Sequence, residues 1–384
     1  MAQALSLLLA AAAVAGCLYQ VAAALLVRRF AAAPPPPATA TAPPVSVMKP
    51  LCGAEPGMAD NLASCLRQDY PAFQLVFGVA DAADPALAEV AKLANGTAEI
   101  TTVIDATPHG RNLKVGNLLN MWPRVRHDLI VIADSDIRVE PHYLNDVVAP
   151  FLDPVTGAKV GVVTCLYIGT PVDGVWSALG ALGVNHGFLP SALLARAIGR
   201  KDGCFGATMA VRRAVLERAG GLERLADILA DDWKLGHMAR QAGLGIELAA
   251  RPVHIMVHEP DFATLLAHEI RWGRTIAAVD RPSYLASVIT QPVALAVLAA
   301  AVGGAGPAAL AVLAAAIACR LWAVRSGEKA LGLPRAGLGL LTMREFLSFL
   351  VYVVASCGRT VIWRGRRFVV RRDGTLDLVE GSAP

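Results

Sequence analysis

The chain has 384 residues, of which 55% are hydrophobic, and its formal net charge is +4. This apolar content exceeds what a soluble globular protein needs, so membrane-spanning segments are expected. The small net charge, with basic residues gathered beside apolar stretches and in the tail, argues against nucleic acid as a partner. Seven cysteines without a C-x-x-C pair indicate neither a disulfide framework nor a zinc site, which suits a reducing compartment.

The N-terminal segment, residues 4–27, is almost wholly apolar and long enough to cross a bilayer as one helix. A cleaved signal peptide would carry positive charge before its apolar run, whereas here Arg28 and Arg29 follow it. We therefore interpret residues 1–29 as an uncleaved anchor, with the arginine pair keeping the next domain in the cytoplasm. Residues 30–44, rich in proline and alanine, are expected to form an extended linker.

Strand-like and helix-like segments alternate from residue 45 to about residue 256, which predicts a sheet flanked by helices. The central segment, Leu129–Ala133, is a short uninterrupted apolar run of the kind found in strands buried on both faces. The other expected strands cover 45–51, 74–80 and 99–104, and the expected helices cover 60–68, 86–93 and 111–121.

Polar side chains follow three of these expected strands: Lys49, Asp81 and the pair Asp134 and Asp136. In open α/β sheets ligands bind beyond the carboxyl ends of strands, and Mg²⁺ or Mn²⁺ takes oxygen ligands and bridges to substrate phosphates. The D-x-D pattern at this point therefore predicts a metal site that holds a nucleotide diphosphate. Taken alone, the pattern is also explained by two acidic residues that solvate a strand end.

Further polar groups follow in the second half of the domain. Asp231 and Asp232 open a helix-like segment, a position that the helix dipole favours on structural grounds alone. A glycine-punctuated loop over residues 203–213 allows close approach of the backbone to a ligand. Downstream, Arg271 offers a bidentate partner for a diphosphate, and Trp272 offers an apolar wall at a membrane boundary.

The order of these features resembles the family 2 type of glycosyltransferases that are processive or act on lipids, whose pattern is D, D-x-D, D and Q/R-x-x-R-W. The matching positions are Asp81, Asp134-x-Asp136, Asp231-Asp232 and Arg271-Trp272. The closer resemblance is to the ceramide glucosyltransferases and their bacterial relatives, including the hopanoid-biosynthesis-associated glycosyltransferases. It rests on Lys49-Pro-Leu-x-Gly53, Asp84-Pro-Ala86, Asp134-Ser-Asp-Ile-Arg-Val139 and Gly220-Gly-Leu222, and covers residues 45–284 and the flanking membrane segments. One position departs from the pattern, because His268 stands where the family has Gln or Arg.

The resemblance implies a GT-A fold: an α/β catalytic domain with a mixed, Rossmann-like sheet, between N-terminal and C-terminal transmembrane helices. It implies that the donor is a UDP-sugar and that Mg²⁺ or Mn²⁺ bridges Asp134 and Asp136 to the diphosphate. Asp232 would be the general base, with Asp231 as its rival. The remaining residues that the resemblance assigns to the nucleotide-sugar are Lys49, Asp81, Lys114, Asn117, His268, Arg271 and Trp272.

A single base is enough for direct displacement at the anomeric carbon, which inverts that centre. An aspartate with an ordinary pKa would be a weak base at neutral pH, so burial or a neighbouring charge is expected to raise the pKa of the base.

The C-terminal part, residues 284–363, is expected to hold transmembrane or interfacial helices. Apolar segments 284–302 and 307–324 predict a hairpin across the bilayer, and amphipathic residues 268–276 before it would bring the site to the membrane surface. The stretch 338–362 contains charged residues: a full span would put the basic tail outside, and an interfacial or re-entrant segment would keep it inside. The tail, residues 364–384, predicts a small hairpin whose basic residues anchor anionic lipid.

These features favour an inverting transferase in a bacterial inner membrane, with a cytoplasmic catalytic domain, that moves a sugar from a UDP-sugar to a lipid hydroxyl. The sequence leaves open whether the donor is UDP-glucose or UDP-N-acetylglucosamine, and whether the acceptor is ceramide or a hopanoid. A polysaccharide synthase is a second hypothesis, but it would need more spanning helices than the three or four candidates seen here. A non-catalytic receptor for nucleotide or lipid is a third, although clustered carboxylates are costly without a ligand.

Overall fold

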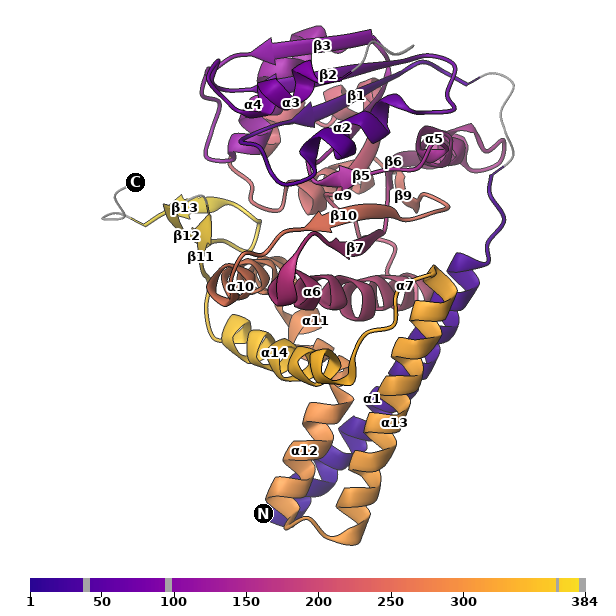
Figure 1. Cartoon of the computed structure of the whole chain (residues 1–384), viewed down its shortest axis with the longest axis vertical. Coiled ribbons are helices and arrows are strands. Elements are labelled where there is room, and N and C mark those ends of the chain that lie inside the picture. The colour runs from indigo at the N-terminus through magenta and orange to yellow at the C-terminus, as the bar shows by residue number, and fades with distance from the viewer. Residues whose placement is uncertain (37–41, 94–98, 364–365, 380–384) are drawn as a thin grey trace.

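A computed structural model describes residues 1–36, 42–93, 99–363 and 366–379. An α/β domain, a layer of crosswise helices and a bundle of long helices follow one another along the long axis (Figure 1). Part of the expected linker, residues 37–41, lies outside the described residues.

The α/β domain is built on a seven-stranded mixed sheet of order β3-β2-β1-β4-β8-β6-β9. The first four strands in this order are parallel, β8 runs antiparallel to β4 and β6, and β9 is parallel to β6. The strands are β1 (Val45–Pro50), β2 (Phe73–Val79), β3 (Glu99–Ile104), β4 (Leu129–Ala133), β6 (Val160–Thr164), β8 (Thr208–Arg212) and β9 (Gly245–Leu248). The predicted strands coincide with β1 to β4 to within one residue.

Alternating side chains of the central strand pack into two hydrophobic cores, one on each face of the sheet. Leu129 and Val131 of β4 join the first core, and Ile130 and Ile132 join the second. This follows from the two-residue period of a strand and explains why the β4 sequence is apolar throughout. Helices cover both faces: α2 (Met58–Leu66), α3 (Ala86–Ala91), α4 (Leu113–Met121), α5 (Tyr143–Leu152), α8 (Arg213–Arg218) and α9 (Asp231–Gln241).

A second sheet and three crosswise runs of helix lie between this domain and the bundle (Figure 1). The sheet has the order β5-β10-β7, formed by β5 (Ile137–Arg138), β10 (Val253–Val257) and β7 (Tyr167–Pro171). The crosswise helices are α6 (Gly174–Gly183), a π-helical turn (Val184–Phe188), α7 (Leu189–Ala197), α10 (Phe262–Val279) and α14 (Leu338–Ser356).

The bundle consists of α1 (Ala2–Ala31), α12 (Pro292–Gly303) and α13 (Pro307–Leu331). The segment predicted to span the bilayer over residues 284–302 is not one continuous helix, because the chain bends by 76° between the run Arg281–Thr290 and α12. That run contains α11 (Arg281–Ala286) and a 3₁₀ turn, and Pro292 then starts α12. Proline at the first helical position lacks only an amide hydrogen that the helix would leave unpaired, so it favours a new start here.

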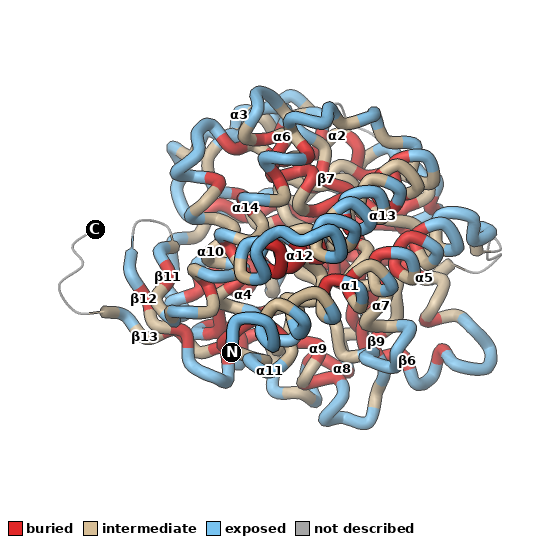
Figure 2. The backbone as a smooth tube through the Cα atoms, turned by 90° about the horizontal axis from the view of Figure 1, so that it is seen from below, coloured by how far each residue is buried: buried red, intermediate tan, exposed pale blue. Residues whose placement is uncertain are grey.

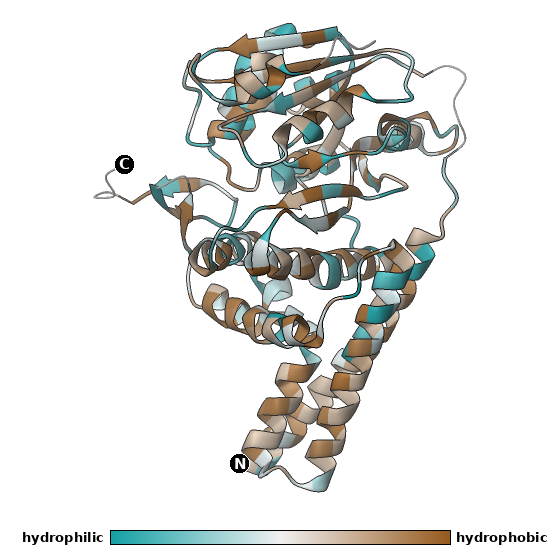
Figure 3. Cartoon of the chain, viewed as in Figure 1, coloured by the Kyte–Doolittle hydropathy of each residue, from teal (hydrophilic) through white to brown (hydrophobic). Residues whose placement is uncertain are grey.

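The bundle presents apolar side chains outward. Leu7 and Leu8 of α1 are 71% and 69% exposed, and Leu310 of α13 is half exposed. The view from below shows the outer faces of these helices exposed (Figure 2), and hydropathy colouring shows them largely apolar (Figure 3). Among the described residues, four helices are long and apolar enough to cross a membrane, and the bent α11–α12 pair makes a fifth if counted as one span. These features are those of a membrane protein.

Helix α14 passes that length test, yet it runs across the end of the bundle and not alongside it (Figure 1). It packs against α10 and α6. The chain after it forms a three-stranded sheet beside the catalytic domain: β11 (Thr360–Trp363), β12 (Arg366–Val370) and β13 (Leu376–Leu378). The tail is therefore more than the expected hairpin, since its sheet begins at Thr360.

This C-terminal sheet contacts the loop before α9. The amide of Leu376 donates to the carbonyl of Asp227 at 2.9 Å, and the amide of Leu229 donates to the carbonyl of Gly374 at 3.0 Å. The sheet thereby supports the backbone that leads into Asp231 and Asp232.

Candidate active site

The strand-end residues gather at one edge of the central sheet. Because β1, β2 and β4 are parallel neighbours, their carboxyl ends meet at that edge and bring Lys49, Asp81 and Asp134 to the same side. Lys49 is fully buried, and its Nζ donates to the backbone carbonyl of Asp134 at 2.7 Å. Lys49 therefore supports the backbone of the D-x-D turn. Its side chain is not accessible for the direct contact with the nucleotide-sugar that the resemblance implies.

Lys114, at the start of α4, links the two groups of acidic residues. Its Nζ lies 2.6 Å from Asp134 Oδ1 and 3.5 Å from Asp231 Oδ2. Burial disfavours the charged ammonium, but these two carboxylates outweigh burial and raise the pKa of Lys114. The site thus holds a permanent positive charge between the D-x-D turn and α9.

Asp136 has an unpaired oxygen at this edge. Its Oδ1 is buried and has no hydrogen-bond partner within the described residues. Burial, together with the charges of Asp134 and Glu55, raises the pKa of Asp136 to about 7. A buried carboxylate oxygen beside a second carboxylate is a donor set that suits a hard divalent cation.

A complete protein cage for a metal is absent from the described part of the chain, where no three His, Cys, Asp or Glu side chains converge on one point. A cation held by two carboxylates and by substrate phosphates needs no third protein ligand. Asp134 and Asp136 therefore fit Mg²⁺ or Mn²⁺ as partners of a bound diphosphate.

Asp231 and Asp232 occupy the first turn of α9 but face different surroundings. Asp231 is 9% exposed and faces Lys114, whereas Asp232 Oδ1 accepts a hydrogen bond from the amide of Trp233 at 2.7 Å. Asp232 has no ion pair with another described residue. Burial, followed by the charge of Asp231, raises the pKa of Asp232 to about 6.

Gly206 belongs to the glycine-punctuated loop, and its missing side chain makes room for Asp232. A Cβ on Gly206 would lie 3.1 Å from Asp232 Oδ2. The close approach expected of this loop is therefore to a carboxylate of the protein itself.

Asp81 and Asn117 differ in how open they are to a ligand. Asp81 follows β2, is exposed, and uses Oδ1 to accept from the amide of Ala83 at 2.9 Å. Asn117 donates to the carbonyls of Gly78 at 2.7 Å and Leu51 at 3.3 Å, and its Oδ1 is buried. Asn117 therefore joins the ends of β1 and β2, and it has no free donor for the nucleotide expected to bind there.

Helix α10 brings Arg271, Trp272 and His268 to the opposite side of the site. Burial lowers the pKa of Arg271, while the charges of Glu259, Asp134 and Asp231 act in the opposite direction. Its guanidinium makes no ion pair or hydrogen bond with the described residues, so it is free to bind an anion. Trp272 is 36% exposed, and its ring lies 4.2 Å from that of His268.

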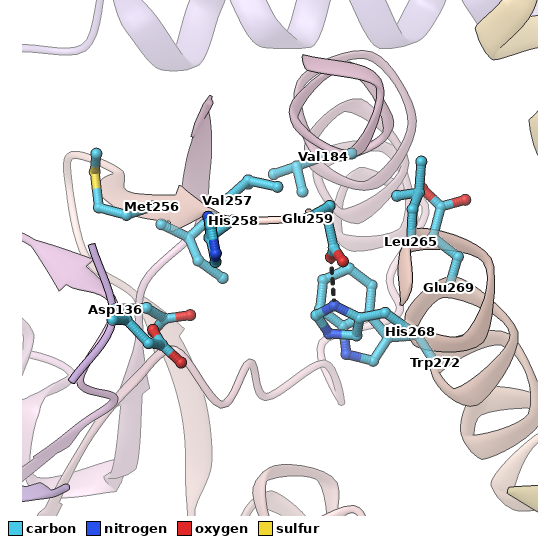
Figure 4. Close-up of a pocket in the computed structure, with 13 residues that line it drawn as sticks. Asp136, Val184, Met256, Val257, His258, Glu259, Leu265, His268, Glu269 and Trp272 are labelled. Atoms are coloured by element: carbon cyan, nitrogen blue, oxygen red, sulfur yellow. Dashed lines mark hydrogen bonds and ion pairs between the residues drawn. The ribbon is translucent and has the colours of Figure 1, made fainter. Parts of the chain in front are cut away.

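A cavity separates Asp136 from His268 and Trp272, and Figure 4 shows these side chains facing one another across it. Its lining includes Gly180 and Val184 of the crosswise α6 run, and Leu265 of α10. The cavity therefore extends from the strand ends to the helices that border the bundle.

Three acidic residues of this cavity, Glu55, Glu259 and Glu269, were not predicted from the sequence. Glu259 follows the end of β10 and is 5% exposed, with Oε1 2.7 Å from His268 Nδ1. Glu269 of α10 is paired with Arg344 of α14, with 2.7 Å between Oε2 and Nη2. The rule that strand ends carry site residues would have pointed to Glu259, but no local signal pairs residues as far apart as Glu269 and Arg344.

Comparison with known proteins identifies the family. The family model for Glycosyl transferase family 21 matches residues 8–376. The chain belongs to glycosyl transferase family 21. It is 22% identical over 359 residues to ceramide glucosyltransferase 1 of Caenorhabditis elegans, a match that covers 89% of this chain and 75% of that protein. The resemblance to the ceramide glucosyltransferases is thus confirmed.

The fold of this family 21 protein is similar to that of the mannosyltransferase PcManGT from Pyrobaculum calidifontis, solved in complex with GDP-Man and Mn²⁺. The TM-score is 0.51 at 19% identity, and the match covers 93% of this chain and 97% of that one. At this identity the likeness concerns the fold, and it confirms the predicted GT-A architecture. The family 21 protein is therefore a glycosyltransferase with a GT-A fold and several helices suited to a membrane.

Proposed function

We propose that this family 21 protein transfers one sugar from a UDP-sugar to a hydroxyl group of a membrane lipid, with inversion at the anomeric carbon. The observation that carries the proposal is the cavity, which joins Asp136 of the D-x-D turn to the crosswise helices above an apolar bundle. A lipid head group reaches such a cavity without leaving the bilayer. The similarity to a ceramide glucosyltransferase supports a lipid acceptor.

The edge of the sheet beside the cavity suits a nucleotide diphosphate. Asp81 stands exposed at the end of β2, where the uracil or ribose would bind. Lys114 and Arg271 supply positive charge, and Asp134 and Asp136 would hold Mg²⁺ or Mn²⁺ against the phosphates. When bound, the cation neutralises the charge that develops on the departing diphosphate. The Mn²⁺ and GDP-Man of the similar mannosyltransferase support this arrangement.

Asp232 is the proposed base. Asp231 forms an ion pair with Lys114. Asp232 has no cationic partner among the described residues, and its pKa is raised to about 6. Asp232 takes the proton of the acceptor hydroxyl as that oxygen bonds to the anomeric carbon. The bond from that carbon to the phosphate oxygen breaks, and UDP departs with both electrons. One displacement inverts the centre, so an α-linked donor yields a β-linked glycolipid.

The test is a product analysis with a matrix of substrates. Membranes that contain the protein are incubated with UDP-glucose or UDP-N-acetylglucosamine, each with ceramide or bacteriohopanetetrol, and lipid products are identified by mass spectrometry. We expect one donor and one lipid to give a monoglycosylated product, and EDTA to stop the reaction until Mg²⁺ or Mn²⁺ is restored. Membranes with the Asp232→Asn variant are the control. Absence of product from every pair would contradict the lipid acceptor, and full activity in EDTA would contradict the metal.

A further inference from the structure

Glu259 is a buried carboxylate with one oxygen unused. Its backbone amide donates to Ser177 Oγ at 2.9 Å, which holds the residue against α6. Oε1 is paired with His268 Nδ1, while Oε2 is buried without a hydrogen-bond partner in the described chain. Leaving a buried acceptor unpaired costs free energy. Because Glu259 lines the cavity, a bound ligand with a hydrogen-bond donor would remove that cost.

His268 presents a second acceptor beside it. A carboxylate at 2.7 Å from Nδ1 favours the tautomer in which Nδ1 carries the hydrogen and donates to Glu259. Nε2 is then an acceptor, and it makes no hydrogen bond with a described residue. The ring of Trp272 lies against that of His268 and limits its orientation. Figure 4 shows the Glu259–His268 pair on the wall opposite Asp136.

Around the Glu259–His268 pair, the acidic lining favours a neutral hydrogen-bond donor over a phosphate that has no cation beside it. Glu259, Glu269, Glu55 and Asp136 all line the cavity, and of these only Glu269 is paired with an arginine in the described residues. A phosphate placed beside the Glu259–His268 pair would meet negative charge, whereas a neutral donor of hydrogen bonds would not. Gly180 lets α6 pack closely against the residues that carry Glu259, since a Cβ on Gly180 would lie 2.9 Å from Val257 and 3.6 Å from Glu259.

We propose that Glu259 and His268 form the subsite for the acceptor head group, an inference that rests on the lipid acceptor proposed above. Glu259 Oε2 and His268 Nε2 accept hydrogen bonds from a hydroxyl or amide N–H next to the hydroxyl that receives the sugar. The acceptor is therefore a lipid with at least two hydrogen-bond donors in its head group, a polyol or an amide alcohol, and not a simple long-chain alcohol. Both residues position the acceptor, and proton transfer remains with Asp232.

The test compares a 1,2-diol lipid with the primary alcohol of the same chain length, in the wild type, Glu259→Gln and His268→Gln. KM for each acceptor, kcat, and the affinity for UDP in the presence of Mn²⁺ are measured. Glu217→Gln, an exposed substitution away from the cavity, is the matched control. We expect the wild type to prefer the diol, and each site variant to raise KM for the diol about tenfold or more while KM for the alcohol and the affinity for UDP stay the same.

Other outcomes overturn the inference. Unchanged preference for the diol in both variants would remove the pair from acceptor binding. Loss of kcat in His268→Gln at unchanged acceptor KM would make His268 a proton-transfer group. Weaker UDP binding in Glu259→Gln would place the pair on the donor side. Failure of the wild type to glycosylate any lipid would overturn the proposed function itself, and it is distinguished by the absence of product before any variant is compared.

Discussion

Asp231 and Asp232 are adjacent in the chain, yet the fold gives their carboxylates different partners. Asp231 forms an ion pair with Lys114. Asp232 accepts a hydrogen bond from the backbone amide of Trp233 and lies in the space left by the missing side chain of Gly206. The helix dipole favours both carboxylates at the start of α9, so position in the helix does not separate them. Their roles follow from their neighbours.

We expect Asp232→Asn to lower the rate of sugar transfer by about 100- to 10,000-fold with nearly unchanged UDP affinity, because it removes the base and leaves the donor side intact. Asp231→Asn is the matched comparison, and it should change donor binding and not the proton transfer, since Lys114 loses one of its two carboxylates while Asp232 is kept. Single-turnover rates and UDP titrations measure the two effects. A variant Asp232→Asn that transfers normally, or that cannot bind UDP, would contradict the assignment.

The pH dependence of kcat/KM should report the same base. The pKa of Asp232 is raised to about 6 by burial and by the charge of Asp231, and the base works only when deprotonated. Activity should therefore rise with pH through about 6 and level off above it. In Asp231→Asn the midpoint should move to lower pH, because the neighbouring negative charge that raises the pKa is gone. A midpoint that does not move would show that another group controls the rise.

At the scale of elements, α14 connects the catalytic side of the molecule to the bundle. Its consecutive residues Arg344 and Glu345 pair in opposite directions: Arg344 with Glu269 of α10, and Glu345 with Arg320 of α13 at 2.7 Å. Gly183 makes this possible, since a Cβ there would lie 2.9 Å from the Arg344 guanidinium. Helix α10 also carries Arg271, which we propose binds the donor diphosphate. The position of Arg271 therefore depends on how α14 holds α10.

We expect Arg344→Ala to destabilise the protein by about 3 kcal/mol, since it leaves the largely buried carboxylate of Glu269 unpaired. It should also raise KM for the donor through α10. The double variant Arg344→Met with Glu269→Met should recover most of the stability, because it removes both charges and keeps the volume. Thermal unfolding in detergent measures this, with exposed Arg335→Ala as control. Equal stability of Arg344→Ala and the wild type would show that the pair contributes little.

At the scale of the whole molecule, the arrangement of α14 and the C-terminal sheet predicts how the chain crosses the membrane. The bundle carries Arg28, Arg29 and Lys329 at the end nearest the catalytic domain, and the loop between α12 and α13 has no charged residue. By the positive-inside rule we expect the catalytic domain to be cytoplasmic. Because α14 runs crosswise, the tail returns to the same side as the domain.

Labelling of intact cells with a membrane-impermeant thiol reagent tests this orientation. We expect Gly306→Cys, in the loop between α12 and α13, to be labelled from outside, and a Cβ at Gly306 meets no atom within 4 Å. The wild type is the control and should stay unlabelled until the cells are permeabilised, because exposed Cys357 at the end of α14 lies on the inside. Labelling of Cys357 in intact cells would show that α14 crosses the membrane.

The sequence by itself determined the features that depend on neighbouring residues. The apolar run Leu129–Ala133 has the composition of a buried strand, and β4 occupies those five residues. The carboxylates after it had to emerge at the sheet edge, because parallel strands end together there. Long apolar segments indicated membrane helices, because the length and composition of a continuous segment are enough to predict that it can cross a bilayer.

Only the tertiary structure decided what each polar side chain meets. Lys49 and Asn117 look like ligands from their place in the chain, but the fold buries Lys49 behind Asp134 and turns Asn117 toward backbone carbonyls. The pairs Glu259–His268 and Arg344–Glu269, the bend before α12 and the crosswise course of α14 depend on packing between distant segments. Hydrogen bonds and ion pairs of this kind are selected by the three-dimensional surroundings, which no local pattern of residues contains.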